Sequence, residues 1–319
     1  MVRPLLALLL ISIVAVTTAV AVGSAHVGIS KVMWVFAGGG TELERTLILD
    51  LRLPRVLSAF ATGGLLAVAG ALMQVLLRNP LADPYVLGLS GGAAVGALLA
   101  MLAGMAGLVV SGSAFVGAML ATLLVFGLAH GSGSWTPSRL LLTGVVVAAG
   151  WGALITLILA MTPAARLPGM LYWLMGDLSH SGRPWTGLIV LLLVCVLVLP
   201  LGRSLNVLAR GSMQAAALGV SVRPLEWLVY LLASLLTATA VTMAGAVGFV
   251  GLVVPHMLRL VLGNDQRLIL PACALAGGIL LVLADTLARV VIAPEQLPVG
   301  VITALLGVPT FLYLLHRSR

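Results

Sequence analysis

The chain has 319 residues, of which 61% are hydrophobic and only 8% are charged, and its formal net charge is +8. A soluble domain carries roughly 25% charged and about 45–50% apolar residues, so this composition excludes an ordinary soluble protein and indicates several membrane spans. The basic residues are scattered singly among apolar runs, a pattern that excludes a nucleic-acid-binding surface of clustered Lys and Arg.

The first apolar run extends from Leu5 to Val22, after a single arginine and before small residues near Ala25. A cleavable signal peptide has a similar order of features, with an apolar core of about 7–15 residues. This run is longer than such a core. We therefore expect it to be retained as the first membrane span.

Apolar runs separated by polar breaks predict ten membrane-spanning helices, because a span needs ~20 predominantly apolar residues. The expected spans cover residues 4–23, 54–77, 86–109, 111–129, 139–161, 186–202, 225–245, 247–263, 268–292 and 298–316. The eighth is short and contains Pro255, which predicts a kink or a break. The predicted fold class is an all-α integral membrane protein whose residues 1–319 form a single domain.

An even number of spans places both termini on one side of the membrane. If that side is cytoplasmic, ten of the basic residues face the cytoplasm and seven face outward. This excess agrees weakly with the positive-inside rule. It leaves the outer arginines in need of another explanation.

Two short segments resemble each other at an offset of 175 residues. AVAGALMQVLLRNP ends ten residues after Gly70, at Pro80, and TMAGAVGFVGLVVP ends ten residues after Gly245, at Pro255. Transporters are often built from two halves of one plan, although a match this short also arises by chance. A true repeat predicts two pseudo-repeated halves in which the Pro80 and Pro255 regions are structural counterparts.

Motifs for covalent chemistry are absent from the sequence. It contains no G-x(4)-G-K-[ST] phosphate loop, no H-E-x-x-H zinc motif and no G-x-S-x-G nucleophile elbow. The five histidines are widely separated, and Cys195 and Cys273 lie inside apolar runs, where we interpret them as small buried residues. The chain is therefore predicted to have no catalytic, cofactor or metal site of its own.

Asp285 is the clearest ionisable residue inside a predicted span, where a charge is costly and is a functional candidate by default. Arg289 follows four residues later, one helical turn away, and is placed to pair with it. A structural ion pair is the favoured interpretation. A proton relay and a role for Arg289 at the outer surface are the alternatives.

The interval from Gly202 to Trp227 carries charged, Ser and Asn residues, which places it outside the bilayer. Gly211 and Gly219 divide it into short helices. The candidates for one shared apolar face are Leu205, Leu208, Met213 and Leu218. Such an element either lies on the membrane surface or docks into a groove on another protein, and docking is favoured because a transporter without a nucleotide site needs a partner.

Several stretches resemble, in order, the signatures of one family. They are LRLPRVLSAFATGGLLAVAGALMQVLLRNPLADPYVLGLSGGA, SRLLLTGV, LYWLMGDL, AGAVGFVGLVVPHMLRL and LADTLARVVIAPEQLPVGVITALLGVPTFLYLL. The resemblance extends over nearly the whole length of the chain. These stretches are similar to the FecCD family, the permease subunits of bacterial type II ABC importers for cobalamin, haem and ferric siderophores.

The resemblance implies the type II importer permease fold and a homodimer in the bacterial inner membrane, with both termini cytoplasmic. It also implies two cytoplasmic ATPase subunits, which bind ATP and Mg²⁺, and a periplasmic binding protein that delivers the ligand. The implied substrate is a metal chelate that carries its own metal and crosses by alternating access. Iron chelates are the favoured substrates on the breadth of the family alone, and cobalamin is the next candidate.

The same resemblance implies a cytoplasmic gate. Asn79 and Leu81 match gate-forming positions at the end of the second span, where Pro80 ends the helix and frees backbone to line an opening. Ser138 matches a second constriction, and Pro137 stands where the cobalamin permease has Thr. These four residues, Asn79, Leu81, Pro137 and Ser138, are the expected gate.

Two partner-docking sites are also implied. Arg52, Arg55 and Arg289 match positions that receive acidic residues of the binding protein, with helix-end anchoring as the alternative. Residues 203–224 match the coupling loop that sits in the ATPase cleft. Its expected contact residues are Leu208, Arg210, Gly211, Ser212, Met213, Leu218 and Gly219. Many relatives have acidic residues after the glycine that matches Gly211, so we expect docking by shape here.

An ion-coupled secondary transporter is the alternative function, because such transporters also use repeats and broken helices. It requires ionisable coupling sites near the middle of the membrane. The sequence offers only Asp285 and its expected partner Arg289 for that role. An intramembrane enzyme is a third class, and no catalytic constellation supports it.

Overall fold

The computed structural model describes residues 2–23, 27–129, 136–179 and 183–317, and within these ranges the regular structure is entirely helical. Ten of the helices are apolar. They are α1 (Val2–Ala21), α4 (Leu53–Leu76), α5 (Leu89–Leu102), α6 (Leu108–Ala129), α7 (Pro137–Met161), α9 (Pro184–Val198), α12 (Val222–Ala244), α13 (Val250–Leu262), α14 (Gln266–Val290) and α15 (Val299–Arg317). Each lies where the sequence predicts a span, so the all-α membrane fold is confirmed.

Seven apolar helices in the described ranges are long enough to cross a membrane, and the shorter three are α5, α13 and α15. The third predicted span, residues 86–109, is the one that the structure shortens most. Gly88 and Gly104 flank α5 with positive φ angles of 71° and 81°, a backbone conformation that ends a helix. The eighth, α13, continues through Pro255 as a single helix.

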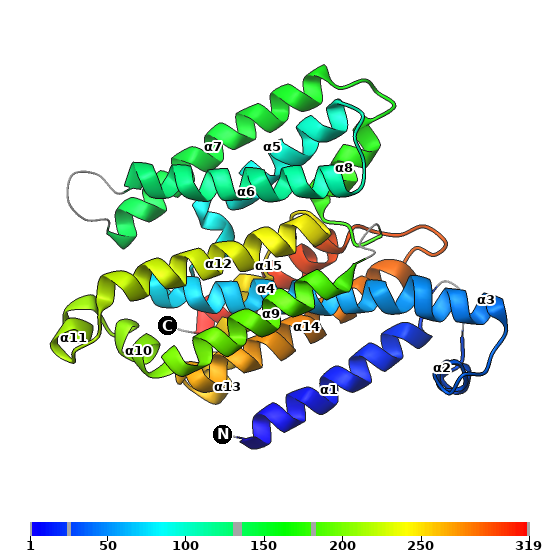
Figure 1. Ribbon diagram of the computed structural model, residues 1–319, viewed down its shortest axis with the longest axis horizontal. Coiled ribbons are helices and arrows are strands. Elements are labelled where there is room, and N and C mark those ends of the chain that lie inside the picture. The colour runs from blue at the N-terminus through cyan, green and yellow to red at the C-terminus, as the bar shows by residue number, and fades with distance from the viewer. Residues whose placement is uncertain (1, 24–26, 130–135, 180–182, 318–319) are drawn as a thin grey trace.

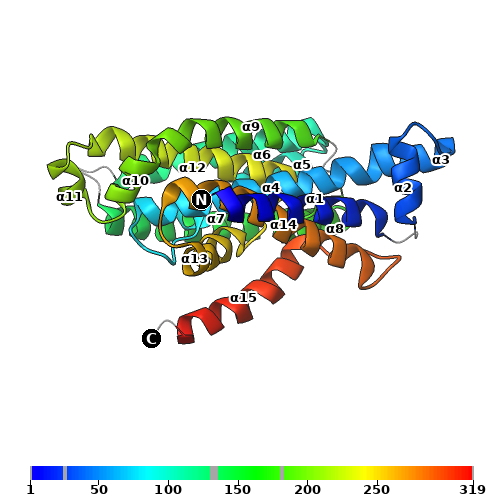
Figure 2. The ribbon, with the colours of Figure 1, turned by 90° about the horizontal axis from the view of Figure 1, so that it is seen from below.

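Shorter elements connect these helices. They are α2 (Ile29–Phe36), α3 (Glu42–Arg45), the π-helix η1 (Thr46–Arg52), η2 (Pro84–Leu87), α8 (Leu167–Met175), η3 (Leu199–Leu201), α10 (Gly202–Leu208) and α11 (Ser212–Ala217). The side chains of Thr41 and Glu44 form a capping box at the start of α3. Helices α2 and α3 lie at one end of the molecule and α10 and α11 at the opposite end (Figure 2). We call these the α2–α3 end and the α10–α11 end.

Helix α4 lies at the centre, packed against α9, α12, α13 and α14 (Figure 1). In its most apolar window 89% of the residues are buried, compared with 11% for α7. Small residues bring the neighbouring backbones close, as is usual between membrane helices. A Cβ atom on Gly63 would lie 2.1 Å from the Gly277 carbonyl oxygen, and one on Gly70 would lie 1.8 Å from the Gly251 carbonyl oxygen.

Helices α5 to α8 form a separate layer beside α12 (Figure 1). Leu98, Ile158 and Met170 form a small buried cluster inside that layer, distinct from the main core around α4. Helix α15 diverges from the other helices toward the C-terminus (Figure 2). The structure thus has one densely packed half built on α4 and one layer whose outer helices are largely exposed.

The two similar sequence segments are not structural counterparts. Pro80 lies in an irregular stretch after α4, whereas Pro255 lies inside α13. Gly70 is in the middle of a helix, whereas Gly245 ends α12 with a φ of 67°. The segments instead pack against each other where Gly70 meets Gly251, and both sequences carry small residues at that contact.

Candidate functional site

The predicted gate begins at the turn that follows α4. Arg78 has a φ of 50°, which is uncommon for a residue with a side chain and turns the chain sharply. The Asn79 side chain stabilises the turn, since its Oδ1 accepts a hydrogen bond of 2.9 Å from the Leu81 amide. Asn79 is half-buried, and Leu81 is 40% exposed. Leu81 therefore presents an apolar side chain at the surface of the chain.

The chain then folds back into the bundle. Asp83 caps η2, because its Oδ1 accepts a 2.7 Å hydrogen bond from the Tyr85 amide. Pro84 packs against Gly251, where an added Cβ would lie 2.7 Å from the proline Cδ. Burial of its carboxyl raises the pKa of Asp83 to about 6.

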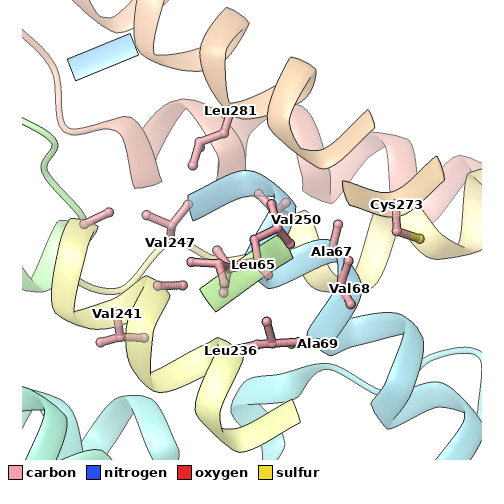
Figure 3. Packing of buried hydrophobic residues seen from close by; sticks show 14 of the residues in the cluster. Leu65, Ala67, Val68, Ala69, Leu236, Val241, Val247, Val250, Cys273 and Leu281 are labelled. Atoms are coloured by element: carbon pink, nitrogen blue, oxygen red, sulfur yellow. The ribbon is translucent and has the colours of Figure 1, made fainter. Parts of the chain in front are cut away.

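Residues 83–87, which include η2, pack against the break between α12 and α13. The Val247 amide donates a 3.2 Å hydrogen bond to the Tyr85 hydroxyl. Figure 3 shows Val247 and Val250 beside Leu65 of α4. Buried irregular backbone persists only where partners satisfy its polar groups. Two irregular segments, 162 residues apart at this hydrogen bond, therefore stabilise each other in a way that sequence reasoning missed.

The second part of the predicted gate lies at the start of α7. Thr136 caps the helix by accepting a 3.2 Å hydrogen bond from the Arg139 amide, Pro137 is its first residue, and Ser138 is exposed. The preceding residues 130–135 lie outside the described ranges. No hydrogen bond joins Ser138 to Asn79 within the described part of the chain. The pairing of the two gate elements stays a prediction.

Asp285 lies at the α2–α3 end, and its side chain is only 1% exposed. Arg289 Nε lies 3.0 Å from Asp285 Oδ2, which confirms the expected pair one turn apart. Arg55 of α4 is a second partner, with Nη2 2.8 Å from Oδ1. The two cations compensate the single carboxylate, so the geometry supports a structural role for Asp285.

Arg52 and Arg289 hold the C-terminal end of α1. Their guanidinium groups donate to the carbonyl oxygens of Ala19, Val20, Ala21 and Val22, at 3.2, 3.0, 3.1 and 3.2 Å. The last carbonyls of a helix have no partner within it and form the negative end of its dipole. Arg52 and Arg289 are accordingly only 7% and 6% exposed.

These contacts support the helix-end alternative for Arg52 and Arg289. Arg55 is the more accessible of the three arginines, with its side chain 14% exposed and Nη1 hydrogen-bonded to Gln296 Oε1 at 2.6 Å. Docking of a binding protein at this end stays a prediction. Sequence reasoning missed the pairing of Arg55 with Asp285, because 230 residues separate them.

The predicted coupling loop forms α10 and α11, with positive φ angles of 140° at Gly211 and 80° at Gly219. The expectation of one shared apolar face is wrong. Leu205 and Leu208 are fully buried, whereas Met213 is 87% exposed and Leu218 is 71% exposed. The turn at Gly211 separates the two helices, so α10 packs inward and α11 projects its apolar residues outward.

Helix α10 is fixed to the start of α14. The Asn206 side chain donates a 2.8 Å hydrogen bond to Asp265 Oδ1 and accepts one of 2.8 Å from the Gln266 amide. Asp265 in turn caps α14. The exposed α11 is therefore carried by a segment that is firmly attached to the bundle.

Comparison with known proteins agrees with this geometry. Residues 8–317 match the model of the FecCD transport family. The chain is 40% identical to the hemin transport system permease protein HmuU of Yersinia pestis, over 85% of this chain and 83% of the relative. It is also 40% identical to the Fe(3+) dicitrate transport system permease protein FecD of Escherichia coli, over 93% and 94% of the two chains.

A solved structure described as an inward-facing conformation of a putative metal-chelate type ABC transporter is also similar. It superposes with a TM-score of 0.88 at 29% identity, over 99% of this chain and all of that one. The overall arrangement of the helices thus belongs to a known architecture. The chain belongs to the FecCD transport family and is a membrane-spanning permease subunit of an ATP-binding-cassette importer.

Proposed function

We propose that two copies of this chain form the path by which a metal chelate enters the cytoplasm from the periplasm by alternating access. Haem, cobalamin and ferric siderophores are the candidate substrates. Two relatives support this class, since their names specify hemin and Fe(3+) dicitrate. Residues 1–319 act in this proposal as one permease domain in the bacterial inner membrane.

The observation that carries the proposal is the exposed α11 at one end of the bundle. A short helix with Met213 and Leu218 exposed is suited to a hydrophobic groove on a partner protein. We assign that partner role to a cytoplasmic ATPase, which binds ATP and Mg²⁺. The α10–α11 end, with both termini, is then cytoplasmic, and residues 203–224 form the coupling loop.

The gate in this proposal is the turn after α4 together with the start of α7. Leu81 seals the path by its apolar side chain, Asn79 fixes the turn that presents it, and Ser138 and Pro137 form the second constriction. The hydrogen bond between Tyr85 and Val247 connects this turn to the start of α13. A movement of α13 is thereby transmitted to the gate.

The periplasmic binding protein is proposed to dock at the α2–α3 end. Arg55 is the arginine best placed to meet an acidic residue, because part of its side chain is exposed. Arg52 and Arg289 contribute indirectly, by holding α1 in position. Charge-assisted contacts of this kind orient a partner and speed its encounter.

Reconstitution into liposomes tests the proposal. The chain and its ATPase are combined with binding proteins loaded with haem, cobalamin or a ferric siderophore, and both ATP hydrolysis and uptake are measured. Stimulation of both by one loaded binding protein identifies the substrate. Uptake driven by an ion gradient, with no ATPase association, would instead support a secondary transporter.

A further inference from the structure

A polar cavity of about 610 Å³ opens at the α10–α11 end, between the end of α4, helix α10 and the turn that joins α13 to α14. Its size falls within the roughly 300–1,000 Å³ of small-molecule sites. The lining groups that matter most are Arg78, Arg210, Arg259, Asn206, Asn264 and Gln266. Asn79 of the proposed gate and Arg210 of the coupling loop also line it, but neither proposal gives the cavity a ligand.

The cavity carries an excess of positive charge. Its lining includes three arginines but only one acidic residue, Asp265. That carboxylate is already engaged, because its Oδ1 accepts hydrogen bonds from the Asn206 side chain and the Arg267 amide. The Asp265 carboxylate therefore interacts with α10 and with the start of α14.

The arginines are only weakly compensated. Arg78 lies 3.8 Å from Glu226, at the limit of an ion pair. Arg259 donates to the Gln74 side chain and the Ala71 carbonyl, and neither acceptor is charged. Arg210 is exposed and forms no ion pair within the described part of the chain. Arg210 and Arg259 therefore present guanidinium groups with no ion-pair partner among the described residues.

Gln266 adds an independent observation. It is only 2% exposed, yet its Oε1 has no hydrogen-bond partner within the residues that the structure describes, and the residue lines the cavity. Buried polar side chains nearly always have a partner. The unpartnered atom is an acceptor, so a ligand that meets it must carry a hydrogen-bond donor, such as a hydroxyl, besides the oxygens that the arginines bind.

We propose that this cavity binds a phosphate-bearing anion. Arginine matches phosphate geometry with paired N–H donors, and a hydrogen phosphate or a glycerophosphate also supplies a hydroxyl for Gln266. The source is either the headgroup of an acidic phospholipid or a free phosphate compound. Basic pockets between membrane helices bind acidic headgroups on the cytoplasmic side.

The position of the cavity gives such a ligand a defined effect. Arg78 adjoins Asn79 of the predicted gate, Arg210 lies in the coupling loop, and Arg259 is in α13. An anion that contacts all three would connect these segments and favour one arrangement of them. This consequence for coupling rests on the proposed function, whereas binding itself does not.

The test measures binding to the purified, delipidated full-length chain, without the ATPase. One arm titrates inorganic phosphate in neutral detergent, and the other detects retained phosphatidylglycerol by native mass spectrometry after exposure to mixed phosphatidylglycerol and phosphatidylcholine. We expect saturable binding in at least one arm, weakened about tenfold by Arg210→Gln and by Arg259→Gln. The arm that binds identifies the source.

Arg203→Gln is the matched control, because Arg203 is an exposed arginine in α10, close in sequence to Arg210, that does not line the cavity. It should leave affinity unchanged. Arg210→Gln is the decisive variant, since an exposed residue can be replaced without loss of the fold, which an unfolding curve verifies. No binding in either arm, or equal losses in the Arg203 and Arg210 variants, overturns the proposal. The same holds if neither probe binds and Arg210→Gln instead weakens ATPase assembly, which would assign the cavity to a carboxylate of that partner.

Discussion

The arginines at the two ends of the bundle differ in their burial and in their partners. At the α2–α3 end, Arg55 and Arg289 share the buried Asp285, and Arg52 is buried against the end of α1. At the α10–α11 end, Arg210 is exposed and Arg259 has only uncharged partners. The first set is part of the structure. The second set is available to a ligand or partner.

The contrast depends on a single carboxylate. Asp285 lies inside a packed helix pair, so it fixes α14 to α4 and, through Arg289, to α1. At the opposite end, Glu226 lies 3.8 Å from Arg78, and no ion pair joins an acid to Arg210 or Arg259 within the described residues. Substitutions of these charged residues should therefore affect stability strongly at the α2–α3 end and weakly at the α10–α11 end.

The largest effect is expected for Asp285→Asn. It leaves Arg55 and Arg289 without their anion in a buried site, a change that typically costs about 3–5 kcal/mol. The free energy of unfolding in detergent measures it. Arg210→Gln is the control from the opposite end and should change stability by less than about 0.5 kcal/mol. Equal losses in the two variants would contradict the comparison.

A second prediction concerns backbone packing between α4 and α13, where the described residues form no ion cluster like the one at Asp285. Gly70→Ala places a methyl group 1.8 Å from the Gly251 carbonyl oxygen, so the helices must separate. We expect a loss of about 3 kcal/mol in the free energy of unfolding. Gly127→Ala is the matched control, since Gly127 is exposed in α6 with open space around it. A Gly70 variant as stable as this control would show that α4 and α13 are not held by close contact.

The sequence predicts one of these two stabilising features better than the other. Asp285 and Arg289 are four residues apart in an apolar run, so helical geometry alone brings them together. Arg55 and Asp285 meet only because α4 packs on α14, and nothing local in either segment specifies that contact. The ten apolar helices are also predicted from local sequence, because each corresponds to one apolar run.

Other misses have similar causes. The short helices between residues 29 and 52 are polar or mixed, so hydropathy does not find them, although the capping box at Thr41 and Glu44 is visible in the sequence. The inward turn of Leu208 and the fold-back that brings Tyr85 to Val247 are set by tertiary contacts. The apparent repeat was misleading because both copies carry small residues for packing, and that need is independent of repetition.

A third prediction uses pH. The pKa of Asp83 is raised to about 6 by burial, so the folded state favours its protonated form. Its contribution to stability is fully present below the unfolded pKa near 4 and is lost as pH rises through about 6. Asp83→Asn keeps a side-chain oxygen to cap η2 and cannot ionise. At pH 7 it should be more stable than the wild type by roughly 2 kcal/mol, with little difference at pH 4.

Unfolding curves at the two pH values check this. A constant difference between wild type and variant would show that Asp83 does not titrate in this range. Asp50→Asn is the control, since Asp50 is an exposed acid at the α2–α3 end. Its variant controls for the removal of one acidic side chain from the surface. If Asp83→Asn alters the pH dependence of stability and Asp50→Asn does not, the pH-sensitive element is the stretch around Asp83.

The smallest effect on stability is expected for Met213→Gln. Met213 is 87% exposed, so its replacement should change the free energy of unfolding by less than about 0.5 kcal/mol. If α11 enters a groove on the ATPase, the same change removes a buried apolar contact from that interface and should weaken binding of the ATPase and coupled transport severalfold. Leu208→Ala is the informative counterpart, because Leu208 is fully buried and its variant should lose about 2–5 kcal/mol. Normal coupling in a stable Met213 variant would instead support the alternative that α11 lies on the membrane surface. The cationic cavity would then be the remaining candidate site at this end.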